Sequence, residues 1–364
     1  MDLGEYEAAG LYDPYAPDAE DRAELIAYLV EIGCTIEEMV AADAHGRLFA
    51  LGGDRIIVPG RDQFSLADVT AETGASIGDV RAVWRALGFV EAADEVPVAS
   101  PEDLEAIRTV INLSALVGLP AALGVGRVVA SSMARVADAI SAAVRTSSPQ
   151  LSLGFSGSEA VTARTFTGVA GAVPRVGQAL DAVFRHHLEA ARRHWERSDS
   201  ADLLDVGGVR LGVGFADLSG FTGMTENLTM AELSSLLTVF EEVADSIVRA
   251  EDGRVVKYIG DAVMYVAHDA AAAVRIAQSL LASAEMRGMQ ARAGVTVGVV
   301  LALEGDYFGP VVNLAARLVS MAGPGEVLVT DEVLARLEEK VEAVTLGPRV
   351  VRGFSNAIEV ARLR

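Results

Sequence analysis

The sequence predicts an α+β protein whose first half is helical and whose second half contains a sheet. Up to Asp199 the apolar residues recur at helical spacing. After Asp199, short valine-rich runs alternate with helical stretches, which is typical of strands and helices in succession. The chain has 364 residues, of which 51% are hydrophobic. It is therefore long enough for two or three domains, because single cores usually stop growing beyond about 250 residues.

The N-terminal half opens with residues 1–20, which are rich in Asp, Glu, Pro, Tyr and Gly. We expect them to form a flexible arm. Residues 21–40 carry two helical patterns, and Thr35 with Glu38 three residues later predicts a capping box at the start of the second helix. Because the helical pattern continues with short breaks, an all-α domain is expected over residues 21–183.

Residues 65–89 outline a helix-turn-helix: a capped short helix, the turn "TGAS" and a second helix. A DNA-reading helix normally carries Arg, Lys, Asn or Gln and lies in a basic field. Here Arg81 and Arg85 are the only cations, against three acidic residues. A structural helix pair is therefore favoured, and a transcriptional regulator stays as an alternative.

The composition limits which classes of partner the protein can bind and which cellular compartment it is expected in. The net charge of −21 disfavours binding to nucleic acid or to anionic membrane surfaces. In the most apolar segment, residues 111–144, Arg127, Arg135 and Pro120 interrupt the pattern, so we expect a buried helix hairpin and no membrane span. The single cysteine, Cys34, cannot form an internal disulfide, and the acidic N-terminus does not resemble a signal peptide. We therefore expect a cytoplasmic protein.

The second half shows strands and helices in a definite order. Strand-like runs occupy residues 209–218, 254–259, 262–267, 292–301 and 326–330. Helical stretches occupy residues 229–250, 269–287, 310–322 and 331–338. Only Gly260 and Asp261 separate the second and third strands, which predicts a hairpin. The order β-α-ββ-α-β, followed by α-β, predicts a ferredoxin-like core with additions.

Polar residues interrupt three apolar stretches, "FADLSGFT", "VVKYIGDAVM" and "GDYFGPVVNLAARL". We expect Asp217 at the carboxyl end of a central strand and Asp261 at the hairpin tip. Two carboxylates at adjacent strand ends suit Mg²⁺ or Mn²⁺, although Asp is also common in ordinary turns. Lys257 lies in the same hairpin of a chain with two lysines and twenty-eight arginines, which indicates that a compact ammonium is required there.

The third stretch carries a further polar set. Asn313 and Arg317 are four residues apart and therefore share one helical face, while Asp306 precedes that helix in a glycine-flanked loop. Asn can hydrogen-bond a sugar or a base, and the fork of Arg can clamp a phosphoryl group. Because the surrounding sequence is apolar, we expect this face to be buried at an interface or a cleft.

Together the three stretches resemble the signature of class III nucleotide cyclases, over roughly residues 205–364. The N-terminal half is similar to the helical autoinhibitory region of some bacterial members. The resemblance implies a homodimer whose two sites are shared between chains. Asp217 and Asp261 of one chain would hold two metal ions, Mg²⁺ or Mn²⁺. Lys257 and Asp306 of the other chain would read adenine, because guanine presents a protonated N1 and a 6-carbonyl.

The resemblance also implies ATP as the substrate, with cyclic AMP and pyrophosphate as products. Asn313 would orient the ribose, and Arg317 would stabilise the transferring phosphoryl group. Arg352 stands where many relatives carry Lys at the triphosphate. The backbone N–H groups expected to hold the phosphates are those of Leu218, Ser219, Gly220, Phe221 and Thr222. A catalytically inactive cyclase-like binding module and a guanylate cyclase remain as alternatives.

A linker helix is expected over residues 184–204, and it contains His186, His187 and His194. Histidine titrates in the physiological range, and neighbouring arginines would lower its pKa. We hypothesise that acid activates the enzyme by releasing the helical domain. A solvated basic helix is the plain alternative, and an apolar small molecule acting on residues 111–144 is another candidate effector.

Overall fold

The computed structural model covers residues 1–364 and divides into two compact units, Met1–Arg185 and His186–Arg364. The division falls within helix α11 (Val173–Arg197). The structure describes residues 2–197, 208–221, 223, 226, 228–337 and 341–364.

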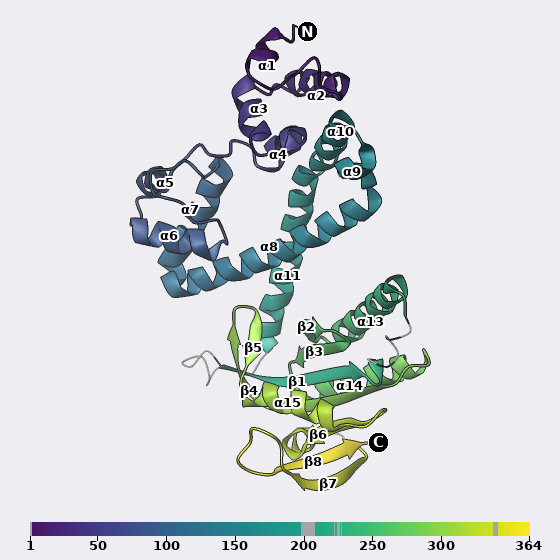
Figure 1. Cartoon of the computed structure of the whole chain (residues 1–364). Coiled ribbons are helices and arrows are strands. Elements are labelled where there is room, and N and C mark those ends of the chain that lie inside the picture. The colour runs from purple at the N-terminus through teal and green to yellow at the C-terminus, as the bar shows by residue number, and fades with distance from the viewer. Residues whose placement is uncertain (1, 198–207, 222, 224–225, 227, 338–340) are drawn as a thin grey trace. The chain divides into compact units, whose positions relative to one another are not determined.

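The first unit is helical (Figure 1). Its α-helices before α11 are α1 (Gly4–Ala8), α2 (Ala19–Glu31), α3 (Ile36–Asp43), α4 (Leu51–Ile57), α5 (Leu66–Thr73), α6 (Ile77–Ala86), α7 (Pro101–Val117), α8 (Leu119–Ser147), α9 (Leu153–Ser156) and α10 (Glu159–Ala170). Short 3-10 turns lie at Leu48–Ala50 and Pro149–Leu151. Capping boxes begin α3 at Thr35, α5 at Ser65 and α7 at Ser100, which confirms the box expected at Thr35 and Glu38.

The N-terminal residues are more ordered than the expected flexible arm. Residues 4–8 form α1, and Leu11 is only 3% exposed. Leu11 lies in a core with Leu25 and Met39, against which the Tyr6 and Tyr12 rings also pack. The composition of residues 1–20 was misleading because a few well-spaced Leu and Tyr side chains bury enough apolar surface to order an otherwise polar segment.

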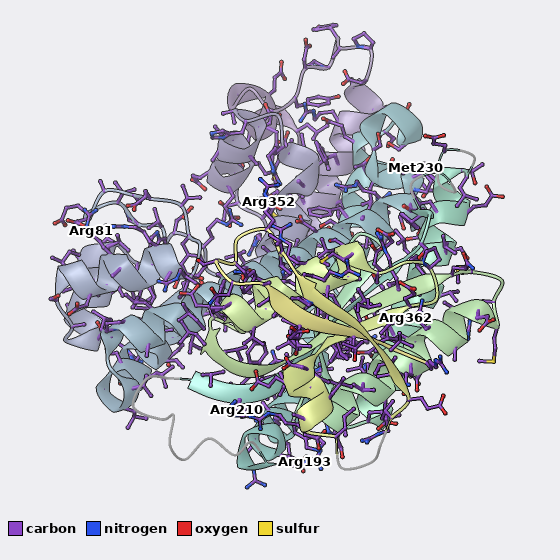
Figure 2. All side chains as sticks on the ribbon, turned by 90° about the horizontal axis from the view of Figure 1, so that it is seen from below. Arg81, Arg193, Arg210, Met230, Arg352 and Arg362 are labelled. Atoms are coloured by element: carbon purple, nitrogen blue, oxygen red, sulfur yellow. The ribbon has the colours of Figure 1, made fainter. Side chains whose placement is uncertain are left out.

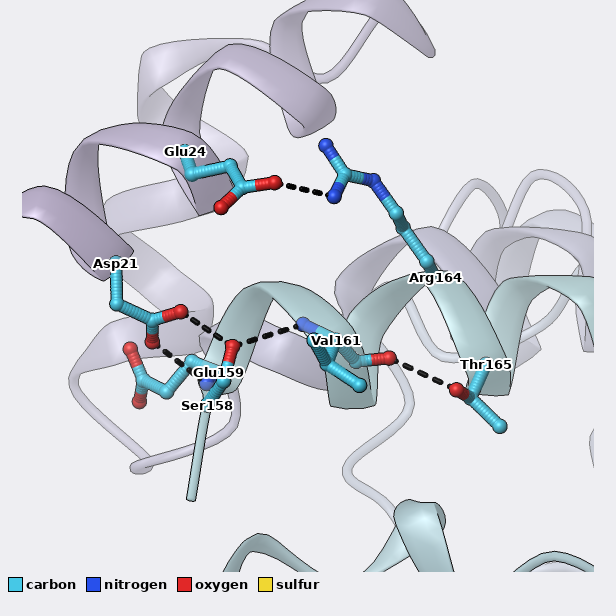
Figure 3. A network of polar contacts seen from close by, with 7 residues as sticks. All are labelled: Asp21, Glu24, Ser158, Glu159, Val161, Arg164 and Thr165. Atoms are coloured by element: carbon cyan, nitrogen blue, oxygen red, sulfur yellow. Dashed lines mark hydrogen bonds and ion pairs between the residues drawn. The ribbon is translucent and has the colours of Figure 1, made fainter. Parts of the chain in front are cut away.

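Helix α2 also holds the start of α10 (Figure 3). The Asp21 carboxylate accepts hydrogen bonds from the Ser158 hydroxyl and, at 2.7 Å, from the backbone N–H of Glu159. It therefore adds a second cap to a helix whose own N-cap is Ser158. Burial raises the pKa of Glu159, and Arg22, whose Nε lies 3.3 Å from Glu159 Oε2, opposes that rise.

The helix-turn-helix outline is confirmed as the helix pair α5–α6, and both of its cations face carboxylates. Arg81 donates to Asp94 with an Nε–Oδ1 distance of 3.0 Å, and the Nε of Arg85 lies 2.7 Å from Glu91. Both acids follow α6 in the chain. The two arginines are thus engaged inside the unit, which does not favour contacts with a phosphate backbone.

The apolar segment 111–144 forms the expected helix hairpin, but most of it is not buried. Helix α8 has 29 residues against 17 in α7, so its second half extends beyond its partner. Its buried residues end at Gly126, whereas Val129 and Ile140 are 46% and 41% exposed. The expectation of burial is therefore wrong for the C-terminal part of α8. No helix in the described residues is long and apolar enough to cross a membrane.

The second unit is built on an eight-stranded sheet with the order β2-β3-β1-β4-β6-β8-β7, and β5 pairs with β4. The strands are β1 (Gly208–Leu218), β2 (Arg254–Ile259), β3 (Ala262–Ala267), β4 (Ala291–Leu303), β5 (Asp306–Phe308), β6 (Val327–Thr330), β7 (Ala343–Arg349) and β8 (Ile358–Leu363). The helices are α13 (Met230–Ala250), α14 (Ala270–Glu285), α15 (Pro310–Met321) and α16 (Asp331–Ala335). All five predicted strands, the hairpin and the four predicted helices are confirmed, while β5, β7 and β8 were not expected.

The two faces of the sheet carry different helices. Helices α13 and α14 pack on one face, in a core that includes Tyr265, and α15 packs on the other, in a core with Phe215 and Met264. Helix α15 lies directly on β4 because Gly294 has no side chain: a Cβ there would be 2.5 Å from the Val319 nitrogen. Alternation along each strand therefore decides which polar side chains share the α15 face.

Candidate active site

Two carboxylates meet where β1 ends beside the β2–β3 turn. Asp217 is the penultimate residue of β1 and lies opposite Ala262 in the β1–β3 ladder, next to Asp261. The N–H of Leu218 donates to the Asp261 carbonyl at 3.3 Å, which holds the turn against the strand end. Gly260 adopts a φ of +62°, as the first position of this two-residue turn requires. The sequence placed both aspartates correctly.

The two carboxyls interact with each other and with an arginine. Burial, together with the hydrogen bond shared with Asp217, raises the pKa of Asp261 to about 6. Arg292 lies opposite Asp217 in the β1–β4 ladder and donates to its Oδ2 from Nη2 at 2.8 Å and from Nε at 3.2 Å. Sequence reasoning missed Arg292; the one available signal was a charged residue near the start of an otherwise apolar strand.

The chemistry of this pair fits a hard divalent cation. Two carboxyls close enough to share a hydrogen bond disfavour double ionisation, and a cation bound between them would remove that penalty. In the part of the chain that the structure describes, no third His, Cys, Asp or Glu completes a cluster. Further ligands would therefore be water or phosphate oxygens, which suits Mg²⁺ because it usually keeps several waters and binds substrate phosphates.

A second pair lies between β2 and the β4–β5 hairpin. The Nζ of Lys257 is 2.5 Å from Oδ2 of Asp306, and the other oxygen of Asp306 accepts the backbone N–H of Tyr307 at 2.8 Å. Asp306 is the first residue of β5 and not a loop residue as expected. The intervening Glu304 and Gly305 both adopt positive φ, which makes a tight two-residue turn.

Asn313 and Arg317 share one face of α15, as predicted. Both are exposed in the single chain, whereas Ala315 and Leu318 between and beside them are buried. Within the described residues neither side chain has a hydrogen-bond or ion-pair partner. Their polar groups are therefore available to a ligand or to another chain.

The segment after β1 differs in part from the expected phosphate cradle. The N–H groups of Leu218 and Ser219 donate to backbone carbonyls of the chain, the latter to Gln290 at 2.7 Å, because β1 continues its ladder to this point. The Ser219 hydroxyl is buried and has no partner among the described residues. Gly220 has a φ of +77° and Phe221 follows it, while Thr222 lies outside the described residues.

Arg352 lies on the loop between β7 and β8 (Figure 2). Its neighbour in the chain, Val351, is buried. The Arg352 side chain is exposed, and no hydrogen bond or ion pair in the described part of the structure joins it to the pairs above. The role expected for Arg352 at the triphosphate therefore stays a prediction.

The regulatory candidates lie on α11. His186 and His187 are exposed, and the side chain of His194 lies outside the described residues. Two of the arginines expected to act on the histidines pair with acids one turn away on the same helix. Nε of Arg185 is 2.9 Å from Asp181, and Nη1 of Arg193 is 3.6 Å from Glu189. Their charge is thus partly compensated locally, which weakens the field the sequence led us to expect.

Comparison with known protein families finds a matching family model for each of the two units. Residues 209–361 match the adenylate and guanylate cyclase catalytic domain, and residues 5–192 match the adenylate cyclase regulatory domain. The chain belongs to the class III adenylate cyclase family, among members with an N-terminal regulatory domain. The resemblance drawn from the three sequence stretches is confirmed, as is the α+β fold class.

Three relatives illustrate the similarity. The chain is 42% identical over 358 residues to an uncharacterized protein of Mycobacterium tuberculosis, which covers 97% of this chain and 92% of that protein. It is 32% identical over 295 residues to an adenylate cyclase of Streptomyces coelicolor, covering 79% and 75% of the two chains. It is 29% identical over 363 residues to a pH-sensitive adenylate cyclase of Mycobacterium tuberculosis, covering 94% and 88%.

Proposed function

We propose that the protein converts ATP to 3′,5′-cyclic AMP and pyrophosphate. The observation that carries this choice is the contact between Lys257 and Asp306, which sets a donor beside an acceptor. Adenine offers an acceptor at N1 and a donor at its 6-amino group, so it matches this pair. Guanine offers a donor at N1 and an acceptor at position 6, and both would meet the wrong partner. The pair therefore supports an adenylate cyclase over a guanylate cyclase.

The site we propose is shared between two copies of the chain. No hydrogen bond or ion pair among the described residues links the Asp217–Asp261 pair to the Lys257–Asp306 pair or to Arg317. Apolar side chains of the β4–β5 hairpin, which contains Asp306, are exposed to solvent: Leu303 is 52% and Phe308 is 48% exposed. A second copy would cover this surface and supply the missing carboxylates. The exposed apolar side chains of α8, among them Val129 and Ile140, offer a second surface for the same homodimer.

The reaction follows from these parts. The ribose 3′-oxygen attacks the α-phosphorus while its hydroxyl proton passes to solvent, the new O3′–P bond closes the ring, and the bond to the pyrophosphate oxygen breaks. Asn313 would orient the ribose, and Arg317 would direct fixed positive charge to the phosphoryl group, where negative charge develops. Arg292 is a candidate cation for the triphosphate. Asp217 and Asp261 would hold two Mg²⁺ or Mn²⁺ ions, which when bound lower the pKa of the attacking hydroxyl and neutralise charge.

We further propose that the N-terminal unit regulates this activity in response to acid, in the cytoplasm. Support comes from the relative named as a pH-sensitive adenylate cyclase and from the exposed His186 and His187 on α11. Replacing His186, His187 and His194 together by Ala should flatten the change in activity between pH 5.5 and 8. A variant that keeps the wild-type pH profile would remove the histidines from the explanation and leave an apolar effector as the candidate.

The activity itself is tested with the purified full chain, Mn²⁺ or Mg²⁺, and ATP or GTP. We expect cyclic AMP from ATP, no comparable product from GTP, and loss of product in Asp217→Asn. Glu359→Gln, which changes an exposed carboxylate on β8, is the matched control and should keep wild-type activity. A folded dimer that binds nucleotide without forming product would indicate the inactive binding module instead.

A further inference from the structure

Strand β2 contains a bulge that changes the direction of its side chains. Val255 lies opposite Tyr265 and Lys257 lies opposite Met264, so Val256 is an extra residue without its own partner on β3. Tyr265 points to the α13–α14 face, while Met264 points to the α15 face. Lys257 therefore points to the α15 face, the same face as Phe215 and, two residues on, Asp217.

The bulge also puts Arg254 on that face. Arg254 lies opposite Val266, which belongs to the α15-side core. In a regular strand, residues three apart point to opposite faces. Because of the extra residue, Arg254 and Lys257 instead project from the same side of β2. Both reach the β4–β5 hairpin.

The two cations hold consecutive residues of that hairpin. Lys257 binds the Asp306 carboxylate. Arg254 donates from Nη2 to the Gly305 carbonyl at 3.4 Å, and its guanidinium carbon lies 5.9 Å from the centre of the Tyr307 ring, within the range of a cation–π contact. Tyr307 is 4% exposed and so is itself fixed in the core. Arg254 thus contacts the residues on both sides of Asp306.

We propose that Arg254 is a positioning residue for base recognition, because it fixes the hairpin that presents Asp306 to the adenine 6-amino group. Among the described residues, the three-residue strand β5 pairs only with β4, so the contacts from β2 add to this pairing and to the burial of Tyr307. A guanidinium suits this position because its planar fork donates to a carbonyl while its face lies against a ring, which an ammonium cannot do at once. The inference rests on the proposed adenylate cyclase activity.

The test compares wild type, Arg254→Ala, Arg254→Lys and the control Arg275→Ala in the full chain. Arg275 on α14 is also an exposed arginine, and it pairs with Glu251, away from the hairpin. We expect Arg254→Ala to lower kcat/KM for ATP about tenfold, mainly through KM, since misplacement by about 1 Å costs up to roughly a hundredfold. GTP turnover should stay within about twofold, so the ATP-to-GTP ratio falls. Arg254→Lys should restore little, and Arg275→Ala should match wild type.

Hydrogen exchange supplies a readout that does not need activity. Residues 305–308 should exchange faster in Arg254→Ala than in wild type or Arg275→Ala, while β4 keeps its protection. Equal losses with ATP and GTP, or unchanged exchange in the hairpin, would overturn the inference. A wild-type protein that forms no cyclic AMP would refute the proposed function, and the exchange measurement would still decide whether Arg254 anchors the hairpin.

Discussion

Replacing Gly294 by Ala tests whether the placement of α15 on β4 sets the position of Asn313 and Arg317, the side chains proposed to act in catalysis. A Cβ at residue 294 would lie 2.5 Å from the Val319 nitrogen and 2.6 Å from the Ala315 carbonyl oxygen. Both are backbone atoms, so no side chain can rotate away. Normal contact requires about 1 Å more, which α15 can provide only by moving as a unit away from the sheet. Asn313 and Arg317 would move with it.

The magnitude follows from that displacement. Overpacking of this kind costs about 1–3 kcal/mol, and a shift of about 1 Å in positioned groups lowers the rate by up to roughly a hundredfold. The assay is cyclic AMP formation by the full chain together with its thermal unfolding. Gly168→Ala, on helix α10 with nothing within 4 Å of its new Cβ, is the control and should leave activity unchanged. Wild-type activity and stability in Gly294→Ala would refute the idea that α15 is fixed by this contact.

Three further predictions concern stability and assembly. Glu326 accepts one hydrogen bond from Nη1 of Arg362 at 2.7 Å, which lowers the pKa of Glu326, so Glu326→Gln should destabilise the second unit by about 1–2 kcal/mol above pH 4.5. In chemical unfolding, that difference should vanish as pH falls through the lowered pKa, and a pH-independent difference would contradict it. Because burial raises the pKa of Glu159, its charge opposes folding as pH rises above about 4.5. Glu159→Gln should therefore raise Tm at pH 7.5 but not near pH 4, and a lower Tm at pH 7.5 would show that the Arg22 contact prevails. Replacing Val129 and Ile140 together by Glu should raise the dissociation constant of the dimer at least tenfold, as measured by sedimentation. An unchanged dimer would exclude this part of α8 from the interface.

The sequence was most informative where periodicity is local. The five strand runs and four helices of the second unit follow from alternating and helical patterns, and Gly260 with Asp261 marks the hairpin directly. Strand β5 was not predicted because three residues are too few to show the alternation of polar and apolar side chains. Strand β7 was not predicted because Gly347 and Pro348 interrupt its strand-like pattern.

The missed features depend on pairing between distant segments. Arg292 becomes part of the site only through the register that sets it opposite Asp217, and no local pattern encodes that register. The bulge at Val256 is likewise visible only in the pairing of β2 with β3. The sequence alone therefore could not predict that Arg254 and Lys257 point to the same face of the sheet. The exposure of the second half of α8 depends on where α7 ends, which hydropathy alone does not report.

The most direct test of the shared catalytic site mixes two variants that should each be inactive. Asp217→Asn removes a proposed metal ligand, and Arg317→Ala removes the proposed phosphoryl contact, which belongs to the other set of residues. If each site takes the aspartates of one chain and Arg317 of the other, a mixed dimer regains one intact site of two. An equimolar mixture refolded or coexpressed together should then form cyclic AMP at roughly a quarter of the wild-type rate, since half of the dimers are mixed. Isolated mixed dimers that form no cyclic AMP, beside an active wild type, would contradict a site built from two chains.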